Sequence, residues 1–350
     1  RYDLRLAAYR SPERLQGLSL HKDVQRAVNL LIRETAKVYS ANVEVVDDDQ
    51  TLHDGYTYNE NGTIRVNLSN TRHALETEPE LPQIRWDVWK GRGVILRYGR
   101  YEPIKNADLT DIAIEIQKVA GFEPTLDILA NVIASYQNDP GKVRDVVKDY
   151  FGRTQWDGVE RVGTALSRYL GAEDSPLNRA YSRVLFTSGA YRGTVPASKA
   201  DLSIVLYGQQ GCGKSTFVRT LIPESLESED LFLDHLPKDL EGKDTQAITV
   251  KKWIIEMSEL VAMSRSTAET MKTFLGKQSE TFRGAYERLD ETRPRRCIFV
   301  GTTNDPQPLT DTTGNRRFGI VPVQKLDLEA WLRDRDQVWA EAYHLLTMMG

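Results

Sequence analysis

The chain of 350 residues carries 46 Lys and Arg against 50 Asp and Glu, a formal net charge of −4. This balance excludes a generally basic nucleic-acid-binding chain, so any surface for a polyanion has to be local. No window approaches about 18 uncharged apolar residues, and no signal-peptide core follows Arg1, so neither a membrane-spanning helix nor a secretory leader is expected. The missing initial Met suggests a piece of a longer protein, and the length predicts roughly two or three domains.

The N-terminal portion is predicted to be small and mixed in structure. Residues 1–65 carry a helical apolar pattern of unknown role, and residues 66–155 are expected to form an accessory domain of short strands and helices. A helix capped by Asp108 should end at Gly121. Turns are predicted at Asn61-Gly62, where two short strands would form a hairpin, and at Gly91-Arg92-Gly93.

Residues 156–350 are predicted to form an α/β domain around a parallel sheet. Four apolar runs have the near-continuous character of buried parallel strands, at Leu202–Tyr207, Lys252–Met257, Arg296–Gly301 and Phe318–Val323. Helices are expected around residues 177–192, at Lys214–Ile222, after a capping box of Ser266 with Glu269, and at the amphipathic C-terminus from Trp331.

A full match to the phosphate-loop pattern G-x-x-x-x-G-K-[ST] ends at Ser215, between a predicted strand and a predicted helix. Lys214 is expected to contact the β- and γ-phosphates of ATP, and the Ser215 hydroxyl to bind Mg²⁺. The alternative, a glycine-rich turn that binds nothing, does not account for the strand and the helix on either side. The expected ATP contacts are Gly208, Gln209, Gln210, Gly211, Cys212, Gly213, Lys214, Ser215 and Thr216.

The two cysteines, Cys212 in this loop and Cys297 in a predicted buried strand, are expected to be reduced thiols, which fits a cytosolic setting. Cys212 is interpreted as a small residue tolerated in the loop, although a redox sensor at a helix N-terminus is the alternative. No Cys/His cluster has the spacing of a zinc site.

Hydrolysis also needs an acidic group that orders Mg²⁺ and the attacking water. Glu259 follows the second predicted strand, where ligands gather in open α/β sheets, and is expected to orient the water. Glu256, inside the strand, is expected to help hold Mg²⁺; its alternative is a buried ion pair with a basic neighbour. Ser258 stands where an Asp is usual, so the division of labour between the two glutamates stays open.

Polar side chains also follow the third predicted strand. Asn304 is expected to hydrogen-bond the γ-phosphate or the water, with an Asx turn into Asp305-Pro306 as the alternative. Further along, Arg316 and Arg317 are adjacent guanidiniums that suit transition-state charge on phosphate, an effect of ~10³–10⁵ in rate when an arginine finger supplies it. Surface salt bridges are the alternative for this pair.

The order of phosphate loop, strand acid, Asn and a Gly-Asn-Arg-Arg-Phe run resembles the virulence-associated E family. That family is similar to superfamily 3 helicases within the AAA+ class. The likeness covers roughly residues 65–350. It also includes Trp156-Asp157-Gly158 with Arg161, Phe282-Arg283-x-x-Tyr286-x-Arg288, and Gly301-Thr-Thr-Asn304.

The resemblance implies an AAA+-type P-loop domain in a ring, expected to be a hexamer, that works as an ATP-dependent DNA helicase. It implies replication of a phage or mobile element in the cytoplasm of a bacterial host, on single-stranded or forked DNA. A primase domain often lies upstream in such proteins; none is recognisable here, and a primase or polymerase is an expected partner. One of Arg316 and Arg317, preferably Arg316, is implied to act in trans on the neighbouring subunit's ATP.

Arginines are concentrated between residues 283 and 296, a location that in superfamily 3 helicases is a hairpin projecting into the ring channel. Several copies around a channel would give it a positive lining without a basic chain overall, and such phosphate contacts are salt-sensitive. Without the family likeness, the run would be interpreted as a solvated face. The expected DNA contacts are Arg283, Arg288, Arg295, Arg296, Lys272 and Lys277.

Three functions therefore compete. The first is a DNA helicase motor, and the second is an ATP-switched assembly, remodelling or loader protein without helicase activity. The third, a nucleotide-binding structural module with little turnover, is opposed by the presence of Glu259, Asn304 and Arg316. DNA-stimulated ATP hydrolysis would distinguish the first two.

Overall fold

The computed structural model describes residues 55–237, 239–258, 265–282, 290–305 and 317–349. Contacts divide the chain into two units, Arg1–Arg65 and Val66–Gly350. In the described part of the first unit, an antiparallel bridge joins Tyr58 to Ile64 across a turn in which Gly62 has a φ of +77°. This bridge confirms the hairpin-type turn predicted there. The turn forms at Gly62 because glycine adopts the left-handed conformation without a steric penalty.

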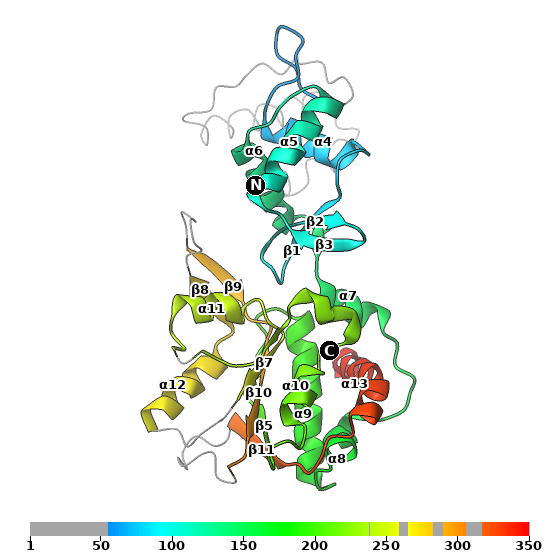
Figure 1. The fold of residues 1–350 in the computed structure, drawn as a ribbon, viewed down its shortest axis with the longest axis vertical. Coiled ribbons are helices and arrows are strands. Elements are labelled where there is room, and N and C mark those ends of the chain that lie inside the picture. The colour runs from blue at the N-terminus through cyan, green and yellow to red at the C-terminus, as the bar shows by residue number, and fades with distance from the viewer. Residues whose placement is uncertain (1–54, 238, 259–264, 283–289, 306–316, 350) are drawn as a thin grey trace, which may run out of the picture. The chain divides into compact units, whose positions relative to one another are not determined.

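The second unit begins with a four-stranded sheet and three helices (Figure 1). The strand order is β3-β2-β1-β4, and all neighbours are antiparallel except β1 and β4, which are parallel. The strands are β1 (Ile84–Asp87), β2 (Arg92–Arg97), β3 (Arg100–Pro103) and β4 (Val143–Arg144). The helices are α4 (Leu68–Thr77), α5 (Asn106–Ala120) and α6 (Leu126–Ser135), the last followed by a 3₁₀ turn at Tyr136–Asn138.

Helix α5 shows how local sequence sets the ends of an element. Gly121 has a φ of +77° and ends the helix, as predicted. Asp108 lies in the first turn, and its carboxylate accepts a hydrogen bond from the backbone N–H of Lys105 at 2.7 Å. That bond and a second from Arg97 hold the pKa of Asp108 below its ordinary value. The N-cap is therefore Lys105 rather than the predicted Asp108, which stabilises the helix N-terminus from inside its first turn.

A five-stranded parallel sheet forms the centre of the remaining part of this unit, so the predicted α/β class with a parallel sheet is confirmed. The order is β11-β5-β10-β7-β6. The strands are β5 (Ser203–Tyr207), β6 (Phe232–Leu233), β7 (Ile254–Met257), β10 (Ile298–Thr303) and β11 (Phe318–Pro322). Four of them correspond to the four predicted strands; β6, only two residues long, was not predicted.

Helices cover both faces of this sheet: α9, α10 and α13 lie on one side, and α11 and α12 on the other (Figure 1). Alternate strand residues accordingly divide between two apolar cores, with Ile204 and Val300 in one and Val205 and Phe299 in the other. The helices are α7 (Val146–Arg153), α8 (Ala165–Leu170), α9 (Pro176–Thr194), α10 (Lys214–Arg219), α11 (Lys243–Thr249), α12 (Arg265–Gly276) and α13 (Leu328–Met349), with 3₁₀ turns at Val162–Thr164 and Glu224–Glu229. None of the helices in the described ranges is long and apolar enough to cross a membrane.

Two predicted helices have different bounds in the structure, and a hairpin lies ahead of β10. Helix α10 ends at Arg219 rather than Ile222, and α12 already begins at Arg265, which places Ser266 inside the first turn instead of ahead of it. Between α12 and β10, the chain forms an antiparallel hairpin of β8 (Ser279–Phe282) and β9 (Glu291–Pro294).

Candidate functional site

The predicted phosphate loop connects the carboxyl end of β5 to the first turn of α10. Gly211 and Gly213 have φ values of +79° and +96°, in the region that favours glycine. A Cβ on Gly213 would stand only 2.6 Å from the Cβ of Leu326. The backbone N–H of Leu326 also donates to the carbonyl of Cys212 at 2.9 Å. The segment after β11 therefore packs directly on the loop, and position 213 has no room for a side chain.

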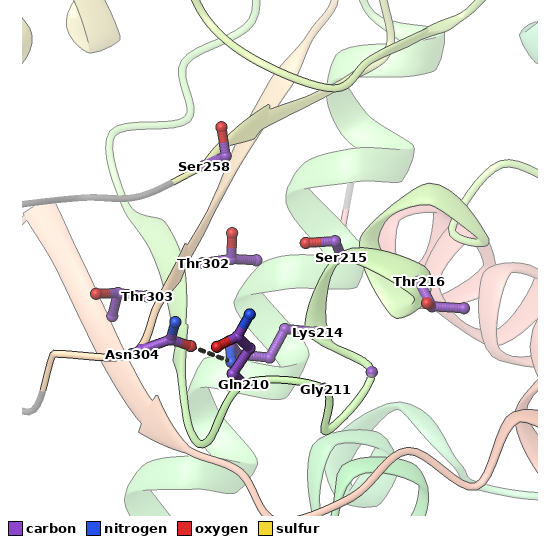
Figure 2. A pocket seen from close by; sticks show the side chains of 10 residues that line it. Gln210, Gly211, Lys214, Ser215, Thr216, Ser258, Thr302, Thr303 and Asn304 are labelled. Carbon is purple, nitrogen blue, oxygen red and sulfur yellow. Dashed lines mark hydrogen bonds between the residues drawn. The ribbon is translucent and has the colours of Figure 1, made fainter.

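Lys214 is the cation at the head of this loop and is 8% exposed. Its Nζ donates to the carbonyl oxygens of Gly208 and Gln209, both at 2.8 Å, and to Oδ1 of Asn304 at 2.9 Å (Figure 2). These three oxygens match the three donors of an ammonium group. Among the described residues no carboxylate pairs with Lys214, so its positive charge is not neutralised locally and can attract an anion.

Glu256 in β7 faces the first turn of α10 and is 3% exposed. Its Oε1 accepts hydrogen bonds from Ser215 Oγ at 2.6 Å and from Thr302 Oγ1 at 2.7 Å. The buried ion pair considered as an alternative for this glutamate is not found within the described ranges. Two hydroxyl groups, one from the loop helix and one from the adjacent strand β10, therefore hold a carboxylate that carries no cationic partner there.

Lys214, Ser215, Thr302 and Asn304 line one pocket of about 350 Å³ at the carboxyl edge of the sheet (Figure 2), and Glu256 is hydrogen-bonded to Ser215 and Thr302 of this lining. That edge is where open α/β sheets bind ligands. Three residues at the pocket, Ser258, Thr302 and Thr303, were not assigned a contact from the sequence. The lining residues are Gln210, Gly211, Gly213, Lys214, Ser215, Thr216, Ser258, Thr302, Thr303 and Asn304.

The oxygen groups around Glu256 fit a magnesium ion that is bound together with phosphate. Mg²⁺ usually keeps several waters and takes one or two carboxylates plus phosphate oxygens, rather than a cage made by protein alone. Glu256 supplies one carboxylate and Ser215 one hydroxyl. The described residues contain no group of three or more His, Cys, Asp or Glu side chains that could hold a metal ion.

The two cysteines are buried and free. Cys212 lies in the loop with its Sγ 3.7 Å from Lys214 Nζ. Burial raises the pKa of the Cys297 thiol, which favours the uncharged form. No disulfide joins them.

Several predicted site residues lie outside the described residues: Glu259, Arg283, Arg288 and Arg316. Arg317 is described, and its guanidinium donates to the backbone carbonyl of Lys272 in α12. Lys277 is partly exposed and pairs with Glu280 at 3.3 Å. Neither contact involves the pocket.

Arg295 and Arg296 do not have the positions predicted for DNA contacts. Arg295 is fully buried, and its guanidinium pairs with the carboxylate of Glu280. Arg296 is 9% exposed, pairs with Asp145, and lies over the ring of Trp89 at 5.4 Å. The prediction that these two arginines bind DNA is wrong, because both charges are already paired inside the protein and cannot reach a phosphate.

The Trp156-Asp157-Gly158 motif lies beside α13, where the backbone N–H of Asp157 donates to Gln337 at 2.8 Å. Both carboxylate oxygens of Asp157 accept hydrogen bonds from Arg161 at 2.8 Å, and the Arg161 hydrogen bonds lower the pKa of Asp157 to about 2. The backbone N–H of Val162 donates to Glu341 of α13 at 2.8 Å. Within the described residues the motif thus has a structural role, joining α7 to the C-terminal helix.

One solved structure supports the fold, and a family model identifies the chain. The A form apo structure of the NrS-1 C-terminal region aligns with a TM-score of 0.51 at 12% identity, over 78% of this chain and 68% of that one. An apo structure of its residues 305–718 gives 0.49 at 13% identity, over 80% and 68%. At these identities the similarity concerns the fold alone. No curated protein matches the chain. The model of the virulence-associated protein E-like domain matches residues 151–349, more than half of the chain, which therefore belongs to that family.

Proposed function

We propose that the chain is a magnesium-dependent P-loop ATPase of the AAA+ type that powers a DNA helicase in the replication of a phage or other mobile element. The observation that carries the proposal is the meeting of Lys214, Ser215 and Asn304 in one pocket at the carboxyl edge of a parallel sheet, with the buried Glu256 carboxylate hydrogen-bonded to Ser215. Family membership agrees with this proposal, since the same residues carried the resemblance in the sequence.

Each of these residues has a definite part in ATP binding. Lys214 would exchange carbonyl and amide contacts for oxygens of the β- and γ-phosphates, which are stronger acceptors for an ammonium. Asn304, released from Lys214, would then be free to hydrogen-bond the γ-phosphate or the attacking water. Ser215 and Glu256 would hold Mg²⁺, whose charge neutralises the phosphates during transfer. Backbone N–H groups of the loop add fixed dipoles that favour the anion.

The other catalytic residues are proposed from their positions in the sequence. Glu259 follows β7 in the sequence and would orient the water. One of Arg316 and Arg317, which precede β11, would complete the site of a neighbouring subunit in a hexameric ring. Because the guanidinium of Arg317 is already bonded to α12 within its own subunit, Arg316 is the better candidate for this role.

DNA contacts are proposed for Arg283 and Arg288, which lie between β8 and β9 in the sequence. Lys272 and Lys277 remain secondary candidates. The burial of Arg295 and Arg296 removes two of the six predicted contacts and thereby favours a second function, an ATP-switched assembly or loader protein that does not translocate.

One pair of experiments distinguishes the two functions. The rate of ATP hydrolysis is measured with and without single-stranded DNA, and strand displacement is then measured on a forked duplex. A helicase motor should hydrolyse ATP faster with DNA and separate the strands; a loader should hydrolyse ATP without strand separation. Absence of ATP hydrolysis under all conditions, by a folded chain with magnesium present, would contradict both.

A further inference from the structure

Glu256 is a buried carboxylate that depends on two hydroxyl groups for its orientation. Ser215 and Thr302 both donate to the same oxygen, Oε1, at 2.6 and 2.7 Å. No Lys, Arg or His of the described chain forms an ion pair with this glutamate. A buried carboxylate without a cation is unfavourable unless hydrogen bonds or an arriving cation compensate its charge. The direction in which it faces a cation is therefore set by these two donors.

The two donors are held by different parts of the fold. Ser215 lies in the first turn of α10, is exposed, and is itself an expected ligand of the ion. Thr302 lies on β10, the strand between β5 and β7, and is 4% exposed. Val300 pairs with Glu256 across β10 and β7, so the ladder of the sheet fixes where the Thr302 hydroxyl stands. Of the two donors, only Thr302 is independent of the loop that binds nucleotide.

We infer that Thr302 is a positioning residue, which holds the Glu256 carboxylate in the orientation that accepts magnesium. This inference rests on the proposed ATPase function and deepens it. A carboxylate that loses its hydrogen-bond donor on β10 can rotate about its last side-chain bond. The ion must then order the carboxylate when it binds, and the free energy spent on this ordering weakens its binding. Thr and Val suit a buried strand equally well, so the hydroxyl is the feature that distinguishes threonine at this position.

The test compares Thr302→Val, which removes the hydroxyl and keeps the shape, with Thr302→Ser, which keeps the hydroxyl. Binding of a fluorescent ATP analogue is measured in EDTA and then across a magnesium titration. Thr302→Val should need roughly tenfold more Mg²⁺ to reach half of the magnesium-dependent binding, the change expected for one hydrogen bond to a charged group. Thr302→Ser should stay within about twofold of the wild type, and binding in EDTA should be equal in all three.

A double-variant cycle with Glu256→Gln tests whether Thr302 acts through Glu256. In that background, Thr302→Val should cause no further change in the magnesium requirement. The inference is overturned if Thr302→Val alone shifts nothing, or if its effect adds in full to that of Glu256→Gln. If Thr302→Val does not fold, Thr302→Ala takes its place against Thr302→Ser. A wild type that binds no analogue at all would instead reject the ATP site itself.

Discussion

Among single residues, Glu256 and Glu259 are separated by only two positions in the sequence but are proposed to have different roles. Glu256 is buried and bonded by hydroxyl groups, an arrangement suited to an ion rather than to a mobile water. We predict that Glu259→Gln keeps ATP binding but lowers the rate of hydrolysis by about 10²-fold or more, since the amide cannot take a proton from water. Glu256→Gln should instead raise the magnesium requirement for binding.

Nucleotide binding and single-turnover hydrolysis, measured separately, check both variants. Normal turnover by Glu259→Gln together with complete inactivity of Glu256→Gln would show that the two roles are reversed. The amide substitutions are matched in size, so a difference between them reports on charge and position rather than on side-chain volume.

The residues of the phosphate loop could be predicted because they are contiguous and their pattern carries its own mechanism. The contact between Thr302 and Glu256 could not, since it depends on the register of β10 against β7, two strands that are distant in the sequence. The burial of Arg295 could not be predicted from the sequence either. A count of charges between residues 283 and 296 does not show that this guanidinium packs 4.1 Å from the Phe274 ring.

At the scale of elements, the β8–β9 hairpin is attached to the core by the buried pair of Arg295 and Glu280. We predict that Arg295→Ala lowers the free energy of unfolding by about 3–5 kcal/mol, because Glu280 would keep a buried charge without its main partner. Urea unfolding measures this loss. Lys277→Ala is the matched control: Lys277 contacts the same Glu280 from a partly exposed position and should change stability by only about 0–1 kcal/mol.

An Arg295→Ala variant of wild-type stability with weaker DNA binding would restore the DNA-contact role that the structure rejects. The element-scale prediction from sequence was best for long apolar strands, such as β5 and β10. It missed β6, since two residues, Phe232 and Leu233, are too few to show any periodicity.

In the molecule as a whole, ion pairs join the four-stranded sheet to the part of the chain that is built on the five-stranded sheet. Glu229 accepts hydrogen bonds from Lys90 at 2.5 Å and from Arg144 at 2.6 Å. Burial alone would raise the pKa of Glu229, but these bonds and charges outweigh it and hold the pKa below the ordinary value of 4.5. The Glu229 carboxylate therefore binds a proton more readily in the unfolded chain than in the folded one. As a result, its contacts with Lys90 and Arg144 stabilise the fold above pH 4.5.

We predict that this stabilisation is lost as the pH falls from 4.5 through the lowered pKa of Glu229. Thermal unfolding from about pH 7 to about pH 3 measures it. Glu229→Gln should be less stable than the wild type at neutral pH, and the difference between the two should shrink on acidification. A difference that stays constant over the whole range would show that Glu229 does not contribute through its charge.

We propose that the pocket around Lys214 binds ATP with magnesium. Calorimetric titration with a nonhydrolysable ATP analogue measures this binding. The wild type and Lys148→Ala, which removes an exposed lysine from α7, should bind the analogue equally. Lys214→Ala should bind it at least about tenfold more weakly, because it removes the cation of the phosphate loop. Equal affinity in all three proteins, with each shown to be folded, would contradict the assignment of the ATP site to the pocket around Lys214.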